Sequence, residues 1–417
     1  MHDANTFTKR KVKVGSLVAV LASALLLSTL GTVSSSAAPA SSAKIGAACP
    51  KAGDQAYPAV IGILLCTKEG KKQTWQYAPG NIRIAVASAT IQANNDVAIQ
   101  GVAKGMGYFA AEKLTATNLL TGGSAAAVQA VGSGSADITG ADLGSVMQAV
   151  EKGVKLKVVG SLVTNWPWRI AVLPGSAIKT GADLKGKKIG IISLASGSFP
   201  FAKAVVTGSD LEITDAQYIP VGLGAPAANA LSTGAVDALA LYTAVYAQIE
   251  SAGTALRYLA NPASMVGVQS LVWVTTADFA EKNPQIIERF MRAAYKALTF
   301  SGTSPEKAMY LGYQQYDTLL AGSTKADRIG PDTKAITVWL ESAGISKTGT
   351  TEGWPKTWGG ISTQAWLRTQ AYAQAAGSIK RAITIEDIWM PRFLAAANNF
   401  DRKAIIAEAK KYKPVTS

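Results

Sequence analysis

The chain has 417 residues and a formal net charge of +14; 48% of its residues are hydrophobic and 16% are charged. This apolar fraction supports a packed core and excludes wholesale disorder, and the length predicts two or three domains. Histidine occurs once, at His2, and cysteine occurs twice. The composition therefore argues against Ser-His-Asp and Cys-His catalysis, imidazole-based zinc sites and iron–sulfur clusters.

The N-terminal segment has the pattern of a secretory signal peptide. Basic residues at 9–13 precede a largely apolar stretch, Leu17–Leu30, and a tail of small residues, Ser34–Ala40. A basic region, an apolar region and a small-residue exit are typical of such signals. The alternative is an uncleaved anchor helix, because Val14–Val33 is just long enough to span a bilayer. We expect residues 1–40 to be a signal peptide and the protein to be exported, to the periplasm, the cell surface or the medium.

The remaining basic residues are dispersed. No basic run beyond the signal is longer than a pair such as Lys71-Lys72 or Lys410-Lys411, and arginine does not alternate with aromatic residues. Nucleic acid is therefore not an expected partner. A basic exported protein is suited to contact with anionic wall polymer or an anionic solute.

Residues 44–78 are expected to form a small β module. Cys49 and Cys66 are the only cysteines, and an oxidising compartment predicts a disulfide between them. Two β-prone runs, 61–67 and Gln73–Tyr77, flank a glycine-containing turn typical of a hairpin. The segment is too short for a self-sufficient core, so the disulfide would supply much of its stability. Its role is either attachment to a wall or partner, or that of a spacer.

From residue 81 onward, one alternation of strands and helices occurs twice. Matching turns, Gly134–Asp137 and Gly234–Asp237, precede the last strand of each copy. The expected strands are Ile82–Val86, Ala116–Leu120 and Asp137–Gly140 in the first copy, and Ile189–Ser193, Gln217–Val221 and Val236–Leu241 in the second. This alternation predicts parallel sheets in two α/β lobes that face a cleft.

Ligands of such sheets bind outside the carboxyl ends of the strands. The loops at 122–124 and 196–198 lead into predicted helices, so their N–H groups and the positive end of the helix dipole would suit an anionic group. Ordinary helix capping is the alternative for both loops.

Several short motifs resemble one family. Asp183–Gly190 is similar to the "DLKGKKIAV" segment of bacterial ABC-transporter solute-binding proteins, and Gly105–Phe109 lies where that family has "KGYF". The two Gly-x-x-Asp turns and Asp278–Pro284 resemble further family motifs. Over roughly residues 81–300, the chain resembles the branch that handles aliphatic sulfonates, taurine, nitrate and thiamine-precursor pyrimidines.

The resemblance implies an α/β, two-lobed, periplasmic-binding-protein-like (type II) fold with the ligand cleft between the lobes. Residues 81–165 and 271–417 would form lobe 1, and residues 166–270 lobe 2. Such a receptor is a monomer without cofactor or catalysis that closes on one small, anionic or pyrimidine-like solute and delivers it to an ABC permease in the membrane. The implied ligand-binding residues are Ser88, Thr90, Asn94, Asn95, Gly123, Ser124, Asp142, Trp166, Ser196, Gly197, Ser198, Tyr242 and Thr243.

The chain departs from the family pattern in two ways. None of these loops contains an arginine to pair with an acid group, and Arg169 is the one nearby candidate. After the second Gly-x-x-Asp strand, the family often has an acid–proline turn, whereas this chain has Leu241–Ala244. The identity of the solute stays open.

The C-terminal third is expected to be helical. Residues 278–300 predict one long helix capped by Asp278, and further helices are expected near 304–320, 332–343, 361–377 and 384–410. The tryptophans in this part predict buried packing rather than a stacking platform for a ligand; they are Trp354, Trp358, Trp366 and Trp389.

Two other classes of function compete with the receptor, an enzyme and a wall-associated protein. The pyrimidine synthase relative of this fold depends on histidine and a cysteine cluster, which this chain lacks, and the matched positions of Asp137 and Asp237 predict structural capping rather than hydrolysis. We therefore expect no enzyme. The alternative is a cell-wall-associated binding or adhesion protein that acts through residues 44–78.

Overall fold

The computed structural model describes residues 43–57 and 64–416. The predicted signal peptide and the beginning of the first β-prone run lie outside these residues. Within the described ranges, none of the helices combines the length and the apolar character needed to cross a bilayer.

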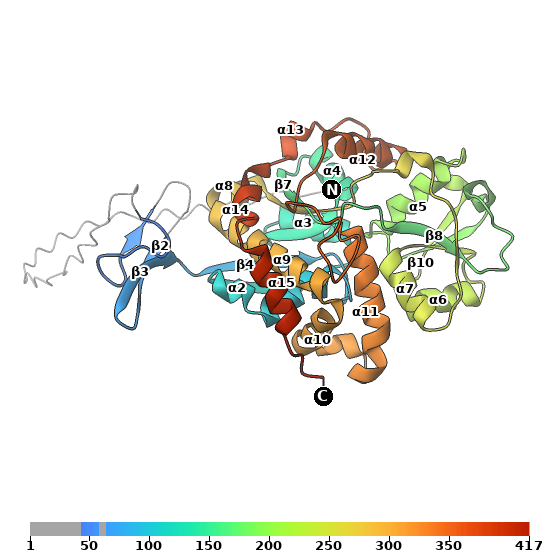
Figure 1. The fold of residues 1–417 in the computed structure, drawn as a ribbon. Helices are drawn as coiled ribbons and strands as arrows, with labels where there is room; N and C mark the ends of the chain where they lie inside the picture. Colours follow the sequence, from blue (N-terminus) through green and yellow to red (C-terminus); the bar gives the residue numbers. More distant parts are fainter. Residues whose placement is uncertain (1–42, 58–63, 417) are drawn as a thin grey trace, which may run out of the picture.

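Two five-stranded sheets form the body of the molecule (Figure 1). The strands of the first sheet, in spatial order, are β5 (Leu114–Leu120), β4 (Gly80–Val86), β6 (Ile138–Asp142), β13 (Leu271–Thr276) and β7 (Leu156–Ser161). Those of the second sheet are β10 (Gln217–Pro220), β9 (Lys188–Ile191), β11 (Ala238–Tyr242), β8 (Trp168–Val172) and β12 (Arg257–Tyr258). All six strands expected from the sequence are present.

The sheets are mixed rather than purely parallel, so that part of the prediction was wrong. In the first sheet β13 runs antiparallel to both neighbours, and in the second sheet β8 does. Each of these strands is the first that the chain forms after crossing from the other sheet, at residues 162–167 and 259–270. The chain therefore passes between the sheets twice, as a two-lobed fold requires.

The helices pack against both sheets, and along the chain they alternate with the strands (Figure 1). Those of the two repeated units are η1 (Asp96–Gly101, a π-helical turn), α1 (Val102–Gly105), α2 (Tyr108–Ala111), α3 (Ser124–Gly132), α4 (Leu143–Glu151), α5 (Ser198–Thr207), α6 (Ala225–Ser232) and α7 (Thr243–Ser251).

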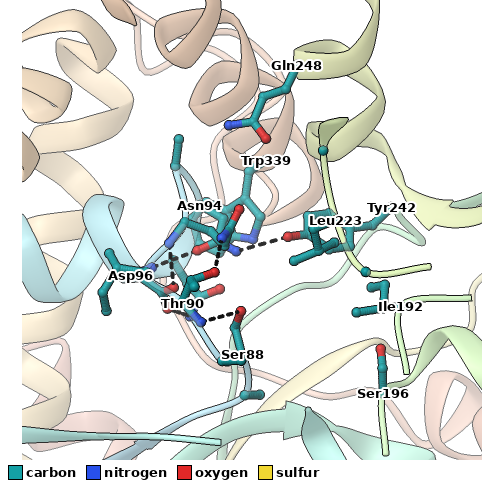
Figure 2. Close-up of a pocket in the computed structure, with 18 of the residues that line it drawn as sticks. Ser88, Thr90, Asn94, Asp96, Ile192, Ser196, Leu223, Tyr242, Gln248 and Trp339 are labelled. Carbon is teal, nitrogen blue, oxygen red and sulfur yellow. Dashed lines mark hydrogen bonds between the residues drawn. The ribbon is translucent and has the colours of Figure 1, made fainter. Parts of the chain in front are cut away.

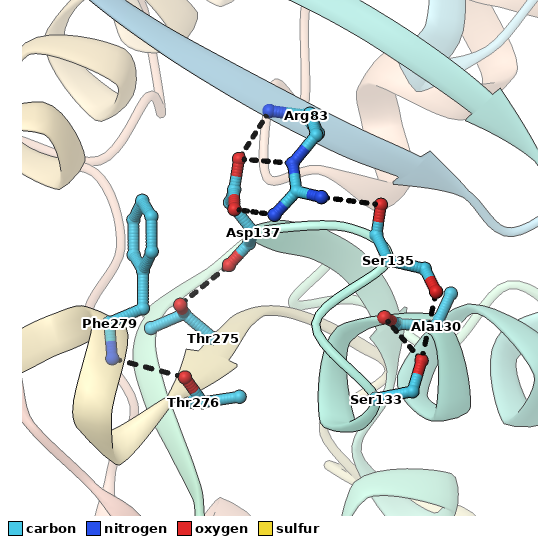
Figure 3. A network of polar contacts seen from close by, with 8 residues as sticks. All are labelled: Arg83, Ala130, Ser133, Ser135, Asp137, Thr275, Thr276 and Phe279. Carbon is cyan, nitrogen blue, oxygen red and sulfur yellow. Dashed lines mark hydrogen bonds and ion pairs between the residues drawn. The ribbon is translucent and has the colours of Figure 1, made fainter. Parts of the chain in front are cut away.

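The two Gly-x-x-Asp turns are structural caps, as predicted. The Asp137 Oδ2 accepts a hydrogen bond from the Arg83 N–H at 2.7 Å, and the Asp237 Oδ2 accepts one from the Lys188 N–H at 2.8 Å. Figure 3 shows the first of these turns, in which the Arg83 guanidinium also faces the carboxylate. Each aspartate thus ties the start of its strand to the neighbouring strand, far from the carboxyl ends of the sheet.

The N-terminal module has its own three-stranded sheet, made of β1 (Gln55–Ala56), β2 (Leu64–Glu69) and β3 (Lys72–Tyr77), and it projects from the first sheet (Figure 1). The predicted Cys49–Cys66 disulfide is present, as is the predicted hairpin between β2 and β3. The module is attached to the body through Tyr77. The Arg292 Nη2 donates to the Tyr77 hydroxyl at 3.2 Å, and the Arg289 guanidinium lies 4.7 Å from the Tyr77 ring centroid.

The long helix expected at 278–300 is two helices, α8 (Ala277–Lys282) and α9 (Pro284–Thr303). Pro284 has no N–H and disfavours the helical conformation at Asn283, so the helix is interrupted there. The expected cap was also wrong. Thr276, rather than Asp278, caps α8, because its Oγ1 accepts from the Phe279 N–H at 3.1 Å.

The remaining helices are α10 (Pro305–Gln315), α11 (Lys325–Ser342), α12 (Thr363–Ala375), α13 (Ile385–Ile388), α14 (Leu394–Ala397) and α15 (Arg402–Lys411). The range 384–410, where we expect one helical segment, instead holds four helices, α13, the 3-10 helix η6 (Pro391–Phe393), α14 and α15. Trp366 is buried, and its Nε1 donates to the Ile383 carbonyl at 3.0 Å. The Trp354 and Trp358 rings pack with centroids 6.1 Å apart. These contacts confirm the packing role.

Helix α12 contacts elements of both sheets. The Thr207 Oγ1, at the end of α5, donates to the Ala375 carbonyl at 3.2 Å. The Gln148 Nε2, on α4, donates to the Ser378 carbonyl just beyond α12 at 3.1 Å. The C-terminal helices are thus part of the connection between the two lobes.

Candidate functional site

A cavity of about 670 Å³ lies at the carboxyl ends of the strands, with walls from both sheets (Figure 2). The first sheet contributes the loop at 87–96, and the second contributes the segments 192–197, 222–225 and 242–243. Helices α7 and α11 also contribute to the wall, through residues such as Gln248 and Trp339. The cavity is therefore where the sequence placed the cleft.

Many of the residues expected to bind ligand line this cavity. They are Ser88, Thr90, Asn94, Asn95, Ser124, Ser196, Gly197, Tyr242 and Thr243. Their side chains are hydroxyls, amides and one phenol, so the wall can donate and accept hydrogen bonds with little charge.

The other four expected residues lie behind the wall. Gly123 has φ +145°, and a Cβ there would be 2.7 Å from the Ala195 carbonyl oxygen, so glycine is required where the two loops meet. The Ser198 Oγ accepts from the Ile192 N–H at 2.9 Å. Trp166 packs edge-on against Tyr372, with ring centroids 5.0 Å apart. These residues support the loops that face the cavity.

Asp142 is the fourth of these residues. Its carboxylate is buried, and its Oδ1 accepts from the Ser145 N–H at 3.2 Å. A Cβ built on Gly197, in the second sheet's loop, would lie 3.5 Å from the Asp142 Cβ. Burial raises the pKa of Asp142 to about 7, since no cation lies among its hydrogen-bond partners in the described residues.

Asn94 and Tyr242 meet across the cavity (Figure 2). The Asn94 Nδ2 donates to the Tyr242 hydroxyl at 3.5 Å, which joins the loop of the first sheet to the strand end of the second. The Asn94 Oδ1 accepts from the Asp96 N–H at 2.9 Å, and the Asp96 Oδ2 accepts from the Gln92 N–H at 3.0 Å. Burial raises the pKa of Asp96 to about 7, and burial beside Asp96 raises the pKa of Tyr242.

The two helix N-termini expected to bind an anion already have protein partners. The Ala125 N–H, in the first turn of α3, donates to the Ala195 carbonyl of the other sheet's loop at 3.0 Å. The Ser193 Oγ donates to the Gly122 carbonyl at 2.8 Å. At α5, the Ser196 Oγ accepts from the Ser198 N–H at 3.2 Å. The N–H groups described above thus serve helix capping and contact between the two loops.

The structure adds wall residues that the sequence reasoning missed. They are Gln92 and Asp96, which lie within the expected loop, Trp168, two positions beyond the expected Trp166, and the helical residues Gln248, Arg328 and Trp339. Nothing in the local sequence of α7 or α11 indicates a cavity, so the last three had no usable signal. Arg169 is not among the residues that line the cavity.

No group of three or more histidine, cysteine, aspartate or glutamate side chains in residues 43–57 and 64–416 is arranged to hold a metal ion. The chemistry that the wall offers is therefore hydrogen bonding, aromatic contact and one arginine.

Comparison with known proteins identifies relatives of two kinds. The sequence model described as NMT1/THI5 like matches residues 94–308. A 4-amino-5-hydroxymethyl-2-methylpyrimidine phosphate synthase of Candida albicans (strain WO-1) is 24% identical over an alignment 215 positions long, which covers 48% of this chain and 62% of the relative. The alignment thus spans about three fifths of the length of that relative.

Solved structures with the same fold include two sulfonate-binding proteins. The periplasmic aliphatic sulphonate binding protein SsuA from Escherichia coli is 20% identical with a TM-score of 0.54, covering 75% of this chain and 93% of its own. The alkanesulfonate-binding protein SsuA from Xanthomonas axonopodis pv. citri, bound to MOPS, is 21% identical with a TM-score of 0.56, covering 75% and 99%. The resemblance seen in the motifs and the expected fold class are confirmed. The chain belongs to the NMT1/THI5-like family, and its two lobes have the periplasmic-binding-protein fold.

Proposed function

We propose that the protein is an exported solute-binding receptor of an ABC importer, which captures one organic solute between its lobes and delivers it to the membrane permease. The observation that carries this proposal is the cavity, because loops at the carboxyl ends of both sheets line it. Residues 81–165 and 271–417 would act as one lobe and residues 166–270 as the other, joined at the two chain crossings. A solute that touches both walls would favour the closed arrangement.

The size of the cavity bears on the solute class. Pockets of about 300–1,000 Å³ hold drug-sized ligands, and 670 Å³ lies within that range. Nitrate and taurine would fill only a small part of this volume and leave the aromatic and aliphatic wall without contacts. We therefore favour a larger solute, a ring-bearing organic acid, a sulfonate or a pyrimidine derivative, over nitrate and taurine.

The names of the relatives support the same choice. Two are sulfonate-binding proteins, and one is a synthase that makes a pyrimidine phosphate. We propose binding rather than catalysis for this chain, because the cavity lining, over the residues that the structure describes, includes neither histidine nor cysteine as a nucleophile or base.

Thermal unfolding of the purified protein with a panel of sulfonates, aromatic acids and pyrimidines tests the receptor function. A solute at about one hundred times its Kd adds about 2.7 kcal/mol to the free energy of unfolding. Tyr242→Phe removes a hydroxyl from the cavity wall, and Tyr218→Phe, on β10 outside the cavity, is the matched control. We expect Y242F to weaken binding at least fivefold and Y218F to leave it unchanged. A panel without any stabilising solute, or equal effects of the two variants, would contradict the proposal.

A second function, attachment to an anionic wall polymer, is favoured by the N-terminal module. The module has its own sheet and disulfide, and its β2–β3 hairpin carries exposed Lys68, Lys71 and Lys72. Reversing these three charges in the full chain should reduce its retention on isolated cell walls while solute binding stays intact. Unchanged retention would leave the module as a spacer.

A further inference from the structure

One charged residue in the cavity wall comes from a helix outside the part of the chain that matches the family model. Arg328 lies in the first half of α11, whereas the match ends at residue 308. Figure 1 shows α11 beside α7 of the second lobe, and the two helices close one side of the cavity. Among the described residues that line the cavity, Arg328 is the only lysine or arginine.

A buried carboxylate holds the Arg328 guanidinium in place. The Arg328 Nε donates to the Asp332 Oδ2 at 3.1 Å, and its Nη2 donates to the Oδ1 at 2.8 Å. Asp332 is completely buried and also accepts from the Tyr313 hydroxyl at 2.8 Å and from the Gln248 Nε2 at 3.3 Å. Four donors thus satisfy this carboxylate and fix the plane of the guanidinium.

The remaining nitrogen of the guanidinium is available to a ligand. Nη1 donates no hydrogen bond to any described residue, and the side chain keeps 32% of its surface exposed. Gln248, which shares Asp332 with Arg328, also lines the wall. Figure 2 shows Gln248 and Trp339 toward one end of the cavity, with Ser88 and Ser196 toward the other.

Among the described residues that line the cavity, the one carboxylate is that of Asp96. The two Asp96 oxygens accept from the Gln92 N–H at 3.0 Å and from the Asn95 Nδ2 at 2.9 Å, and its side chain is buried. The loop at 87–96 therefore supplies its own donors to this carboxylate, and Arg328 is an oriented cation on the α11 side of the wall.

We infer that Arg328 Nη1 binds an acidic group of the solute, a carboxylate, sulfonate or phosphate ester, while the body of the solute lies against the loop at 87–96 and Tyr242. This inference rests on the proposed receptor function and deepens it. A charge-assisted hydrogen bond to a preoriented guanidinium favours the acid over a neutral amide of the same shape, because the orientation of the donor is set before binding.

Calorimetric titration with matched probe pairs tests the assignment. The probes are naphthalene-2-sulfonate and its sulfonamide, and indole-3-acetate and its amide. In the wild-type protein, we expect at least one acid to bind about tenfold more tightly than its amide. Arg328→Met should weaken that acid about 10- to 100-fold and leave the amide unchanged. Lys334→Met removes the same charge from an exposed position of α11 that does not line the cavity and should change neither affinity.

Because R328M leaves Asp332 buried without its cation, the double variant R328M/D332N repeats the test in a neutral, isosteric background. Loss of the acid preference in both variants supports the inference. Binding of acid and amide with equal affinity, or an acid preference that survives R328M, overturns the role of Arg328 while the receptor function stands. If neither these probes nor the wider solute panel binds the wild-type protein, the receptor proposal and the inference fail together.

Discussion

The two α/β units share one turn and differ at the strand end that follows it. In the first unit, Asp137 is nearly buried and accepts from both the main chain and the guanidinium of Arg83. In the second unit, Asp237 is exposed and accepts from the Lys188 N–H. The aspartate of the first turn therefore accepts more hydrogen bonds than that of the second, and neither aspartate lines the cavity.

The strands after these turns end in different residues. Strand β6 ends at Asp142, which lies behind the cavity wall, and β11 ends at Tyr242, which lines the cavity and meets Asn94. The comparison teaches that the repeated motif holds the sheets together, whereas the wall of the cavity includes positions at which the two units differ. Four predictions test this division, from the largest expected effect to the smallest.

The first prediction concerns Asp142, which has a raised pKa of about 7. Tyr242, at the equivalent strand end, has a pKa raised above that of free tyrosine and does not titrate between pH 4 and pH 8. A carboxyl with a pKa of about 7 in the folded state and 3.8 in the unfolded chain binds its proton more tightly when folded. Stability is therefore highest below pH 4 for this group and falls as the pH rises to about 7. At about 1.4 kcal/mol per unit, the loss reaches about 4 kcal/mol.

Asp142→Asn mimics the protonated form and should flatten this pH dependence, as measured by urea unfolding between pH 4 and pH 8. Asp96 has a raised pKa of about 7 in the same range, so its share of the slope should survive in D142N. Y242F is the matched control and should retain the full slope. An unchanged slope in D142N would show that Asp142 is ionised in the folded protein at low pH.

The second prediction compares the two turns directly. Asp137→Ala leaves the Arg83 N–H without its side-chain acceptor and removes the nearly buried carboxylate that faces the guanidinium, at a cost of about 2 kcal/mol. Asp237→Ala removes one exposed cap and should cost about 1 kcal/mol. Urea midpoints measure both. Equal costs would mean that the arginine adds nothing to the first turn.

The third prediction compares the serines that begin α3 and α5. The Ser198 Oγ accepts from the Ile192 N–H at 2.9 Å and is fully buried, while the Ser124 Oγ accepts from the Asp142 N–H at 3.1 Å. Each substitution by alanine leaves a main-chain donor unpaired and should cost about 1 kcal/mol, with Ser198 the larger because its hydroxyl is the more deeply buried. A larger loss for S124A would place the more important loop contact in the first unit.

The fourth prediction is the smallest. Arg83→Met removes the guanidinium but leaves the main-chain donor to Asp137 in place, and the Arg83 side chain is 49% exposed. We expect a loss of about 0.5 kcal/mol, which decreases in high salt. Comparing R83M with D137A separates the side-chain part of the turn from its main-chain part. A loss as large as that of D137A would assign the whole effect to the ion pair.

Local patterns predicted the strands, the capped turns and the loop at 88–96, because each depends on neighbouring residues. They did not predict that β8 and β13 run antiparallel, since strand pairing joins distant segments. The sequence does show a cause for the interruption at Asn283, namely Pro284. The helical periodicity of the flanking residues nevertheless favoured one continuous helix. Trp166 and Trp168 flank Pro167, and the sequence does not show which of them lines the cavity. Trp166 packs against Tyr372, and Trp168 lines the cavity.

The C-terminal contribution to the site was the least accessible from sequence. Arg328 and Trp339 reach the cavity because α11 packs beside α7, and Gln248 joins them through Asp332. The packing of these two helices is a tertiary contact, and the spacing of residues along the chain does not predict it.

The attachment of Tyr77 has a consequence for how the whole molecule is presented. Arg289 lies against the Tyr77 ring and donates through its Nη1 to the Ala78 carbonyl at 3.0 Å, while Arg292 donates to the Tyr77 hydroxyl. The junction between the N-terminal module and the body is thereby held at three points, the Ala78 carbonyl, the Tyr77 ring and the Tyr77 hydroxyl. A protein tethered through this module would hold its cavity at a set direction to the tethering surface, as an oriented receptor rather than a freely tumbling one.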